Sequence, residues 1–435
     1  MKAIFKLLII LTAIVFPVLA MDTYWDQFRG QRGNGISTSA NPPLKWDEKE
    51  NVVWKTEIHG RAWSSPVVYD GQIWLTTATE DGHQLFAISV DEKTGKIIYD
   101  LKIFDIERPQ AIHKFNSYAS PTPVIEKGRV YVTFGSPGTA CIDTSNGKVL
   151  WERRDFVCNH YRGAGSSPIL YKNLLLMHFD GSDYQYIVAL DKDTGKTVWK
   201  KDRSINYDDL GPDGKPVQEG DYRKAFATPH IAIIEGKPIW LSQGSKAIYG
   251  YNPLTGEEMW RVEERSNYSA SNRPLYEDGV VYCQTGWSSG QILAIMPGEK
   301  GEVIDANKPA ESGKKLKVLW SSKRNVPKKP GMIFHNNMLF TIDDSGIASC
   351  LDAKTGKEFW RERVGGNYSA SPIFAAGRVY FFSEEGKTTV IEATNRFNVI
   401  AINQLENGFM ASPAVIGNAF ILRTKTHLYR IEEHK

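Results

Sequence analysis

The sequence predicts an all-β protein, an eight-bladed β-propeller whose four-stranded antiparallel blades form a ring closed by an N-terminal strand in the last blade. Two observations predict this fold. A turn motif that ends on an aromatic residue recurs along the chain, and short apolar strands with glycine-containing turns precede each copy. With 41% hydrophobic and 24% charged residues among 435, the chain has the composition of a globular protein, which excludes wholesale disorder and coiled coil.

The first 20 residues are typical of a secretory signal peptide. Lys2 and Lys6 precede the apolar run 7–16, and Val18-Leu19-Ala20 forms a small-residue cleavage site. We expect cleavage after Ala20 and a mature protein that is periplasmic or secreted, with no transmembrane span; an uncleaved anchor is the alternative. The predicted organisation is a signal peptide (1–20), an N-terminal extension (21–50) and the propeller (51–435).

The charge is nearly balanced. The whole chain carries 53 basic and 50 acidic side chains, a net charge of +3, and removing two lysines with the signal peptide leaves 3 − 2 = +1. A near-neutral chain gives no reason to expect nucleic acid or an anionic membrane as a partner. We expect a monomer.

The four cysteines do not form a disulfide framework by their spacing. Cys141, Cys158, Cys283 and Cys350 are scattered, without a CxxC or a vicinal pair. Cys141 and Cys350 occupy the repeat position where other copies have Ala189 and Gly250, which indicates a small buried residue. The spacing leaves a Cys141–Cys158 bridge open.

The recurring motif is clearest in residues 189–199 (ALDKDTGKTVW) and 350–360 (CLDAKTGKEFW). Alternating apolar residues predict a strand, and the aspartate can accept hydrogen bonds within the turn that follows. Thr-Gly then supplies the positive φ of a tight hairpin, and the next strand carries the aromatic. We expect these aromatics to be structural wedges between neighbouring blades: Trp54, Tyr99, Trp151, Trp199, Trp260, Trp320 and Trp360, with a weaker copy around Val399.

Counting the units gives a closed ring. Seven complete units start near residues 64, 120, 166, 228, 269, 330 and 370, and an eighth begins at residues 411–413 without a final hairpin. The isolated strand 52–56 can supply the missing outer strand, which leaves no open sheet edge. Two stacked β-sandwiches are the alternative, but sandwiches lack this periodicity. We expect the polar insertions 202–221 and 297–317 to be surface loops.

The repeat resembles the tryptophan-docking motif of eight-bladed propellers related to pyrroloquinoline quinone (PQQ) dehydrogenases. The opening WDQFRGQRGNGIS (25–37) and the stretches NSYASP (116–121), HYRGAGSSP (160–168) and HFDGSD (178–183) resemble PQQ-like propeller proteins of planctomycetes and marine Bacteroidetes. The resemblance covers residues 25–433. It implies the fold, and it spans both quinoprotein dehydrogenases and non-enzymatic BamB-like scaffolds of outer-membrane barrel assembly.

The dehydrogenase branch implies a Ca²⁺ site of Glu, Asn and Asp, a vicinal disulfide over the quinone, an aspartate base and long insertions that roof the cofactor. This sequence has no Cys-Cys pair and no such insertions. We therefore expect no PQQ and no other cofactor.

The segment before each blade's first strand is the candidate site. In a propeller these segments converge around one mouth of the central channel, and here they are rich in basic and aromatic residues. They predict a funnel for a small anionic or polyhydroxylated ligand, held by Arg forks and ring stacking; the alternative is a set of satisfied turns and inter-blade hydrogen bonds. The candidate residues are Arg61, Trp63, His113, Asn116, Tyr118, His160, Arg162, Asp180, Arg223 and Lys224.

A metal site is the weaker interpretation of the same region. His113, His160, His178 and Asp180 could bind a metal only if the fold united them, and we expect none.

The leading hypothesis is a non-catalytic, exported binding or scaffold module that uses its channel mouth and blade faces, with a protein partner or a small ligand. The alternative is an enzyme or accessory protein in extracellular polysaccharide degradation, and a PQQ-dependent dehydrogenase is the weakest of the three.

Overall fold

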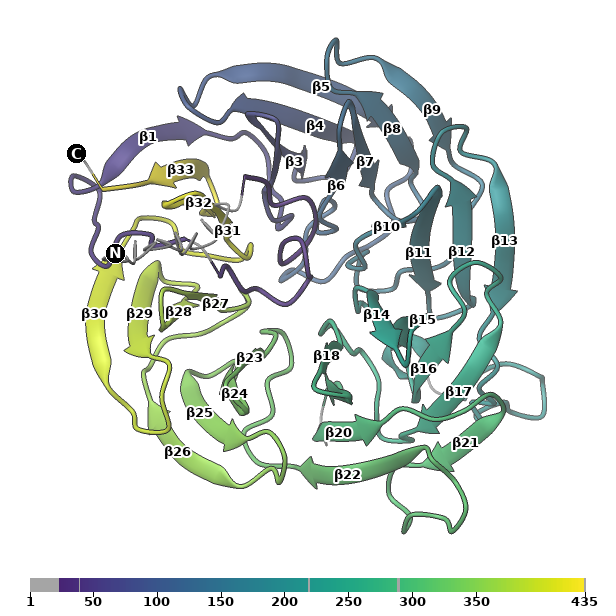
Figure 1. The fold of residues 1–435 in the computed structure, drawn as a ribbon. Coiled ribbons are helices and arrows are strands. Elements are labelled where there is room, and N and C mark those ends of the chain that lie inside the picture. The colour runs from purple at the N-terminus through teal and green to yellow at the C-terminus, as the bar shows by residue number, and fades with distance from the viewer. Residues whose placement is uncertain (1–22, 39, 218–219, 288–289, 434–435) are drawn as a thin grey trace, which may run out of the picture.

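The computed structural model describes residues 23–433 except 39, 218–219 and 288–289, so the predicted signal peptide lies outside the described residues. Eight sheets stand around a central axis like the blades of a propeller (Figure 1). Their strands are antiparallel and consecutive in sequence within a blade, with two exceptions described below. The predicted eight-bladed propeller is confirmed.

The blades are numbered in chain order, each from its innermost strand outwards. Blade 1 has β2 (Val67–Tyr69), β3 (Gln72–Ala78), β4 (Gln84–Asp91) and β5 (Ile97–Asp105). Blade 2 has β6 (Val124–Glu126), β7 (Arg129–Thr133), β8 (Thr139–Asp143) and β9 (Val149–Arg153). Blade 3 has β10 (Ile169–Tyr171), β11 (Leu174–Asp180), β12 (Gln185–Asp191) and β13 (Thr197–Asp202). Blade 4 has β14 (His230–Ile234), β15 (Lys237–Gln243), β16 (Ala247–Tyr251) and β17 (Glu258–Glu263), preceded by the 3₁₀ turn η1 (Gly220–Arg223).

The second half continues this pattern. Blade 5 has β18 (Leu275–Glu277), β19 (Val280–Gln284), β20 (Ile292–Met296) and β22 (Lys317–Ser322). Blade 6 has β23 (Ile333–His335), β24 (Met338–Ile342), β25 (Ile347–Asp352) and β26 (Glu358–Arg363). Blade 7 has β27 (Ile373–Ala375), β28 (Arg378–Phe382), β29 (Lys387–Glu392) and β30 (Val399–Gln404). Blade 8 has β31 (Ala414–Ile416), β32 (Ala419–Arg423), β33 (His427–Ile431) and, outermost, β1 (Val52–Glu57).

The ring closes as predicted. β1 pairs antiparallel with β33, so that Trp54 lies opposite Arg430. The two ends of the chain therefore share blade 8, and an N-terminal strand completes the sheet that the C-terminal strands begin.

One expectation about the insertions is wrong. The stretch 297–317 is not only a surface loop, because it contains β21 (Glu302–Asp305), which pairs in parallel with β17. Blade 4 therefore has five strands. β21 is short and gains its backbone hydrogen bonds from the free edge of β17, so its own sequence carries little strand signal.

The repeat turns have the predicted chemistry. The Asp91 carboxylate accepts hydrogen bonds from the Thr94 amide and hydroxyl, both at 2.7 Å, and Gly95 follows with φ of 71°. Asp191 and Asp352 make the same pair of contacts with the threonine three residues later.

The outer-strand aromatics reach into the next blade. Trp199 of blade 3, for example, lies against Gly256 of blade 4. Trp260 differs, because it lies against Gly250 of its own blade, where an added Cβ would meet the indole at 2.3 Å. Five of the aromatics donate a side-chain hydrogen bond to a backbone carbonyl in the following blade. The donor and acceptor pairs are Trp54–Glu92 (3.0 Å), Tyr99–Ser145 (2.8 Å), Trp151–Lys192 (2.9 Å), Trp320–Ala353 (2.9 Å) and Trp360–Thr394 (3.1 Å).

Small residues stand opposite these aromatics. Cys141 pairs with Trp151 and Cys350 with Trp360, as Ala189 does with Trp199. All four cysteines are buried and free, so the Cys141–Cys158 bridge that the spacing left open is not formed.

The N-terminal extension threads the centre of the ring, where Figure 1 shows it crossing the space between the innermost strands. Trp25 bridges to Val68 of β2 in blade 1, and Ile36 bridges to Phe374 of β27 in blade 7. Between them, the Asp26 carbonyl accepts a hydrogen bond of 2.8 Å from the Ile125 amide of β6. The extension then leaves past blade 8 to reach β1, since the Asn41 amide donates to Asn418.

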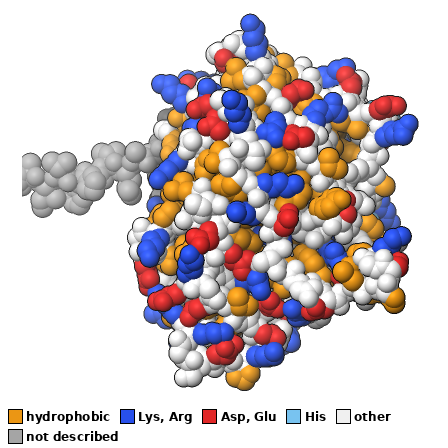
Figure 2. Space-filling model, turned by 90° about the vertical axis from the view of Figure 1, so that its right-hand side faces the viewer, with side chains coloured by type: hydrophobic (Ala, Val, Ile, Leu, Met, Phe, Trp, Pro, Cys, Tyr) orange, Lys and Arg blue, Asp and Glu red, His pale blue; other side chains and the backbone are white. Residues whose placement is uncertain are grey.

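Acidic, basic and apolar side chains are interspersed on the side of the molecule seen in Figure 2, without a large patch of one sign. Among the described residues, no helix is long and apolar enough to cross a membrane.

Candidate functional site

The antiparallel blades place two sets of loops at one end of the ring, which we call the entry face. These are the connections that lead into each innermost strand and the turns between the second and third strands of each blade. The predicted channel-mouth residues lie on the entry face. Aromatic residues also gather there: of the five aromatics most exposed among the described residues, Phe115, Tyr161, Tyr184 and Trp287 lie on this face and only Phe359 lies on an outer strand.

Six of the entry-face aromatics are linked around the channel mouth, either directly or through backbone groups and neighbouring residues. We call these six side chains the aromatic belt: Trp63, Phe115, Tyr161, Tyr222, Tyr268 and Trp287. They come from the segments that lead into blades 1 to 5 and from the second turn of blade 5. Phe115, Tyr161 and Trp287 are 36%, 37% and 40% exposed.

The belt can be followed from one aromatic to the next. The Tyr161 ring covers Gly220 at the start of η1, where an added Cβ would meet the ring at 2.2 Å. Two residues on, Tyr222 packs against Tyr268 with ring centroids 4.9 Å apart. The Tyr268 carbonyl accepts a hydrogen bond of 3.0 Å from the Trp287 amide.

The connection 106–123, which leads into blade 2 and carries Phe115, links the other belt residues. The Phe115 carbonyl accepts a hydrogen bond of 2.9 Å from the Trp63 indole. The Asn116 side chain donates to the Arg162 carbonyl at 2.8 Å, next to Tyr161. The contact of Lys329 with Phe115 brings the entry of blade 6 to the same connection, so that residues from opposite sides of the ring meet over the mouth.

Cations stand over the belt rings. A cation over an aromatic face is attracted by the ring quadrupole, and the pair then presents a flat apolar surface beside a positive charge. Lys246 serves both Tyr222 and Tyr268. The pairs, with distances from the charged group to the ring centroid, are Arg61–Trp63 (5.3 Å), Lys329–Phe115 (4.1 Å), Arg162–Tyr161 (5.3 Å), Lys246–Tyr222 (5.4 Å), Lys246–Tyr268 (5.8 Å) and Lys328–Trp287 (4.6 Å).

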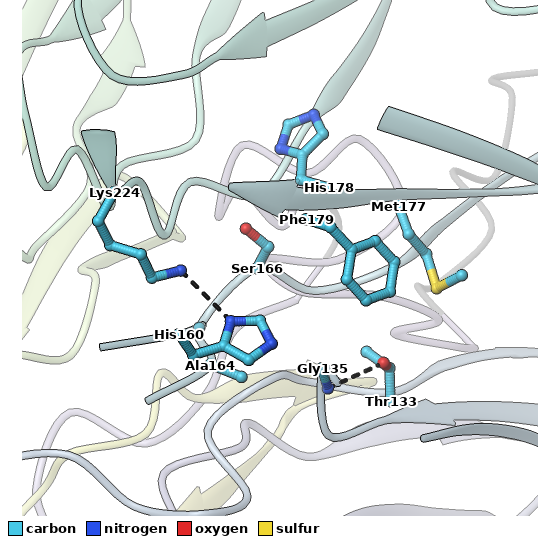
Figure 3. A pocket seen from close by; sticks show the side chains of 10 residues that line it. Thr133, Gly135, His160, Ala164, Ser166, Met177, His178, Phe179 and Lys224 are labelled. Atoms are coloured by element: carbon cyan, nitrogen blue, oxygen red, sulfur yellow. Dashed lines mark hydrogen bonds between the residues drawn. The ribbon is translucent and has the colours of Figure 1, made fainter. Parts of the chain in front are cut away.

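His160 and Lys224, two predicted ligand residues, are buried beneath this surface. They are 5% and 2% exposed, and the Lys224 ammonium lies 3.5 Å from His160 Nδ1 (Figure 3). The Ser136 amide donates to His160 Nε2 at 2.8 Å, so that nitrogen is an acceptor. Burial and the Lys224 charge lower the pKa of His160 well below its ordinary value, so the imidazole is neutral at pH 7.

The cavity between these residues is small. Its volume is about 10 Å³, and His178, Phe179 and Thr133 are among the other residues that line it (Figure 3). That is room for about one water molecule. The cluster therefore resembles an interior polar network more than a pocket for a substrate.

Asp180 is also withdrawn from the surface. Its carboxylate receives a two-pronged ion pair from Arg203, with Nε at 2.9 Å and Nη2 at 2.7 Å, and both side chains are 1% exposed. Arg203 in turn donates to Ser242 at 2.6 Å, and the Ser242 hydroxyl contacts His178 Nε2 at 2.8 Å. The Arg203 charge and hydrogen bonds hold the pKa of Asp180 below its ordinary value against the opposing effect of burial.

Some of the remaining predicted residues make contacts within the fold, and the others lie in or beside the aromatic belt. Arg223 pairs with Asp209 at 3.0 Å, and Tyr118 packs over Gly82, so both are used within the fold. Arg61, Trp63, Asn116 and Arg162 lie in or beside the belt, and the exposed His113 joins them through a backbone hydrogen bond to Arg162.

Sequence reasoning missed most of the site. Of the belt aromatics and the cations over them, the candidate ligand residues included only Arg61, Trp63 and Arg162. Lys246, Lys328, Lys329 and five belt aromatics were not among them, because they sit in turns and connections that lie outside the repeat. A signal was present: each is an aromatic or basic residue at a turn on the same end of a blade.

Together, eight antiparallel blades with this turn chemistry define a PQQ-like β-propeller. A family model described as "Outer membrane protein assembly factor BamB" matches residues 37–154, 86–223, 183–316 and 300–399, and the chain belongs to this family.

Curated relatives are distant and only partly covered. Quinoprotein alcohol dehydrogenase PedH of Pseudomonas putida is 28% identical over 190 residues, which is 41% of this chain and 28% of the relative. Outer membrane protein assembly factor BamB of Yersinia pestis is 21% identical over 217 residues, 47% of this chain and 49% of the relative. The chain thus spans less than half the length of these relatives.

Solved structures share the fold. The crystal structure of BamB from Moraxella catarrhalis aligns with a TM-score of 0.57 and 11% identity, over 87% of this chain and 99% of that one. A europium-containing methanol dehydrogenase aligns with a TM-score of 0.50 and 11% identity, over 93% of this chain and 88% of that one.

The quinone that part of the family implies does not fit the residues present. Each cysteine is free, and no group of three His, Cys, Asp or Glu side chains within the described residues could hold a metal ion. The N-terminal extension also occupies the centre of the ring. We therefore derive no step through PQQ or Ca²⁺.

Proposed function

We propose that the protein is an exported, non-catalytic binding propeller that holds a polyhydroxylated, anionic chain, such as an acidic polysaccharide, across the aromatic belt. The observation that supports this proposal most directly is the aromatic belt, in which a cation stands over each of the six rings. Flat rings suit the apolar faces of sugars, and the interleaved Lys and Arg side chains suit carboxylate or sulfate groups.

The chemistry beneath the belt supports binding over catalysis. The buried histidines are held neutral, Asp180 is paired, and the cavity at His160 admits about one water. A general acid or base must reach its substrate within hydrogen-bond distance, and these groups are covered by the belt and by one another.

The test is binding of defined glycans by calorimetry to the mature protein, with acidic and neutral chains of equal length. Trp287→Ala should weaken binding of the acidic chain about tenfold, equivalent to about 1.4 kcal/mol. The matched control is Phe359→Ala, because Phe359 is equally exposed at 41% but lies on outer strand β26. Equal affinity for all three proteins, or no glycan binding, would contradict the proposal.

The same experiment separates the other candidates. Shortened glycan products in the incubation would favour the enzyme of polysaccharide degradation. The names of the BamB relatives refer to assembly of outer-membrane proteins, and a protein-scaffold role would appear as a stable protein complex that survives Trp287→Ala.

A further inference from the structure

The N-terminal extension carries a buried arginine into the centre of the ring. Arg29 is 2% exposed. Its Nη2 donates to the carbonyls of Asn34 at 2.8 Å and Met332 at 2.5 Å, which ties the extension to the entry of blade 6. Its Nε and Nη1 are buried without a hydrogen-bond partner among the described residues.

A second buried arginine meets the extension from blade 5. Arg273 is 3% exposed, and its Nη1 and Nη2 donate to the Phe28 carbonyl at 2.7 Å and to Gln27 at 2.9 Å. Its Nε is also without a partner. The close fit requires Gly33, since an added Cβ there would lie 2.1 Å from the Arg273 guanidinium carbon.

The two guanidinium groups repel one another. Burial and the Arg273 charge lower the pKa of Arg29 to about 9, and both arginines therefore stay charged at pH 7. His230 of β14 feels both charges; its pKa is lowered to about 3, and its Nδ1 also lacks a partner.

Counting charges leaves an excess. Asp26 is the acid whose charge acts on Arg273, and neither arginine forms an ion pair with a carboxylate among the described residues. One carboxylate against two guanidinium groups leaves one positive charge in a buried region. An uncompensated buried charge is costly.

Two other buried arginines have acceptors for their guanidinium N–H groups. Arg203 has the Asp180 carboxylate. Arg423 has no acid, but its Nη1 donates to three oxygens of Ser64 and Thr76. Arg29 and Arg273 instead keep three buried side-chain nitrogens, Nε and Nη1 of Arg29 and Nε of Arg273, without acceptors among the described residues.

We propose that a small monovalent anion, such as chloride, binds on the propeller axis between Arg29 and Arg273 and so fastens the N-terminal extension to blade 5. The anion would accept the unpaired N–H groups and balance the excess charge. This site is independent of the aromatic belt and of the proposed glycan.

The direct test is anomalous diffraction from crystals of the mature protein soaked in bromide, which replaces chloride. We expect a bromide peak within hydrogen-bond distance of both guanidinium groups. Density there that water alone accounts for would overturn the site.

The solution test uses chloride itself. At constant ionic strength, replacing gluconate with chloride should raise the melting temperature in a titratable way. Arg273→Gln should abolish this rise, whereas Arg32→Gln, an exposed arginine of the same extension, should retain it. If Arg273→Gln does not fold, Arg273→Lys keeps the charge without Nε and should bind chloride more weakly. A rise that is equal in all variants would overturn the fastening role.

Discussion

The indole Nε1 of Trp54 donates a hydrogen bond of 3.0 Å to the carbonyl oxygen of Glu92, so that the first strand of the sequence, which completes the last blade, also grips the first blade. Gly95 lies directly beneath the same indole, where an added Cβ would meet the ring at 2.6 Å. Trp54 therefore links blade 8 to blade 1 in two ways, by this hydrogen bond and by the packing of its indole on Gly95.

Trp54→Ala should lower the free energy of unfolding by about 3–5 kcal/mol, through lost burial and the cavity left behind. Limited proteolysis should begin in blade 8, because its outer strand loses its hold on blade 1. Trp360→Ala should be similarly destabilising without this local opening. If these two variants and the exposed-site control Phe359→Ala all melt at the temperature of the wild type, the structural role of the aromatics is wrong.

Asp180→Asn should destabilise the protein by about 3–5 kcal/mol, because it leaves the Arg203 guanidinium buried and uncompensated. Adding Arg203→Met to this variant should recover much of the loss, since the charge is removed as well. Urea unfolding of the single and double variants gives the coupling. A double variant that is less stable than Asp180→Asn would contradict the interpretation.

Stability should fall as the pH falls below about 6.5, the ordinary pKa of histidine. Burial lowers the pKa of His178 and His230 to about 3, so between about 6.5 and 3 these two groups bind protons only when the chain unfolds. Burial also lowers the pKa of His160 well below its ordinary value, which acts in the same direction. Each contributes up to about 1.4 kcal/mol per pH unit. Asp26, with its pKa raised to about 6, opposes this between about 4 and 6, but it is one group against three.

Urea unfolding at several pH values measures this slope. His178→Asn should reduce it, and His113→Gln, at an exposed site, should not. An unchanged slope in His178→Asn would show that His178 is protonated in the folded protein.

The four thiols should not react readily in the native protein. All four are buried, and burial raises the pKa of Cys158 to about 11 and those of Cys141 and Cys350 to about 12. A thiol reagent should label none of them quickly at pH 8 and all four after denaturation. Fast labelling of the native protein would contradict the burial of these side chains.

PQQ should not bind. After incubation with PQQ and Ca²⁺ and removal of free quinone, the protein should show no stoichiometric quinone absorbance. Stoichiometric absorbance would overturn this prediction and revive the dehydrogenase alternative.

The repeat made the blades predictable, because each copy encodes a strand, a capped turn and an aromatic within a dozen residues. β21 escaped notice since residues 302–305 become a strand only beside β17. The path of the N-terminal extension was not predicted for a related reason. Arg29 contacts Met332, 303 residues away in sequence, and no local pattern encodes such a contact.

The candidate site was predictable only in part. The convergence of the entry segments followed from the topology, so Arg61, Trp63 and Arg162 were found. The burial of each side chain was not predictable, because a lysine such as Lys224 can lie buried or exposed in the same kind of loop, depending on which segments cover it. The charged residues that turned inward did so against partners distant in sequence, as Asp180 at the end of β11 did against Arg203, which follows β13.

The pairing of β1 with β33 sets an order of events during synthesis. The ribosome makes residues 52–57 long before residues 427–431, so the earliest strand has no partner until nearly the whole chain exists. Blades 1 to 7 can form from local hairpins as they emerge, whereas blade 8 must await the final strands. A chain truncated before residue 427 should therefore remain an open arc with an unpaired strand at each end, which is a substrate for chaperones and proteases rather than a shorter propeller.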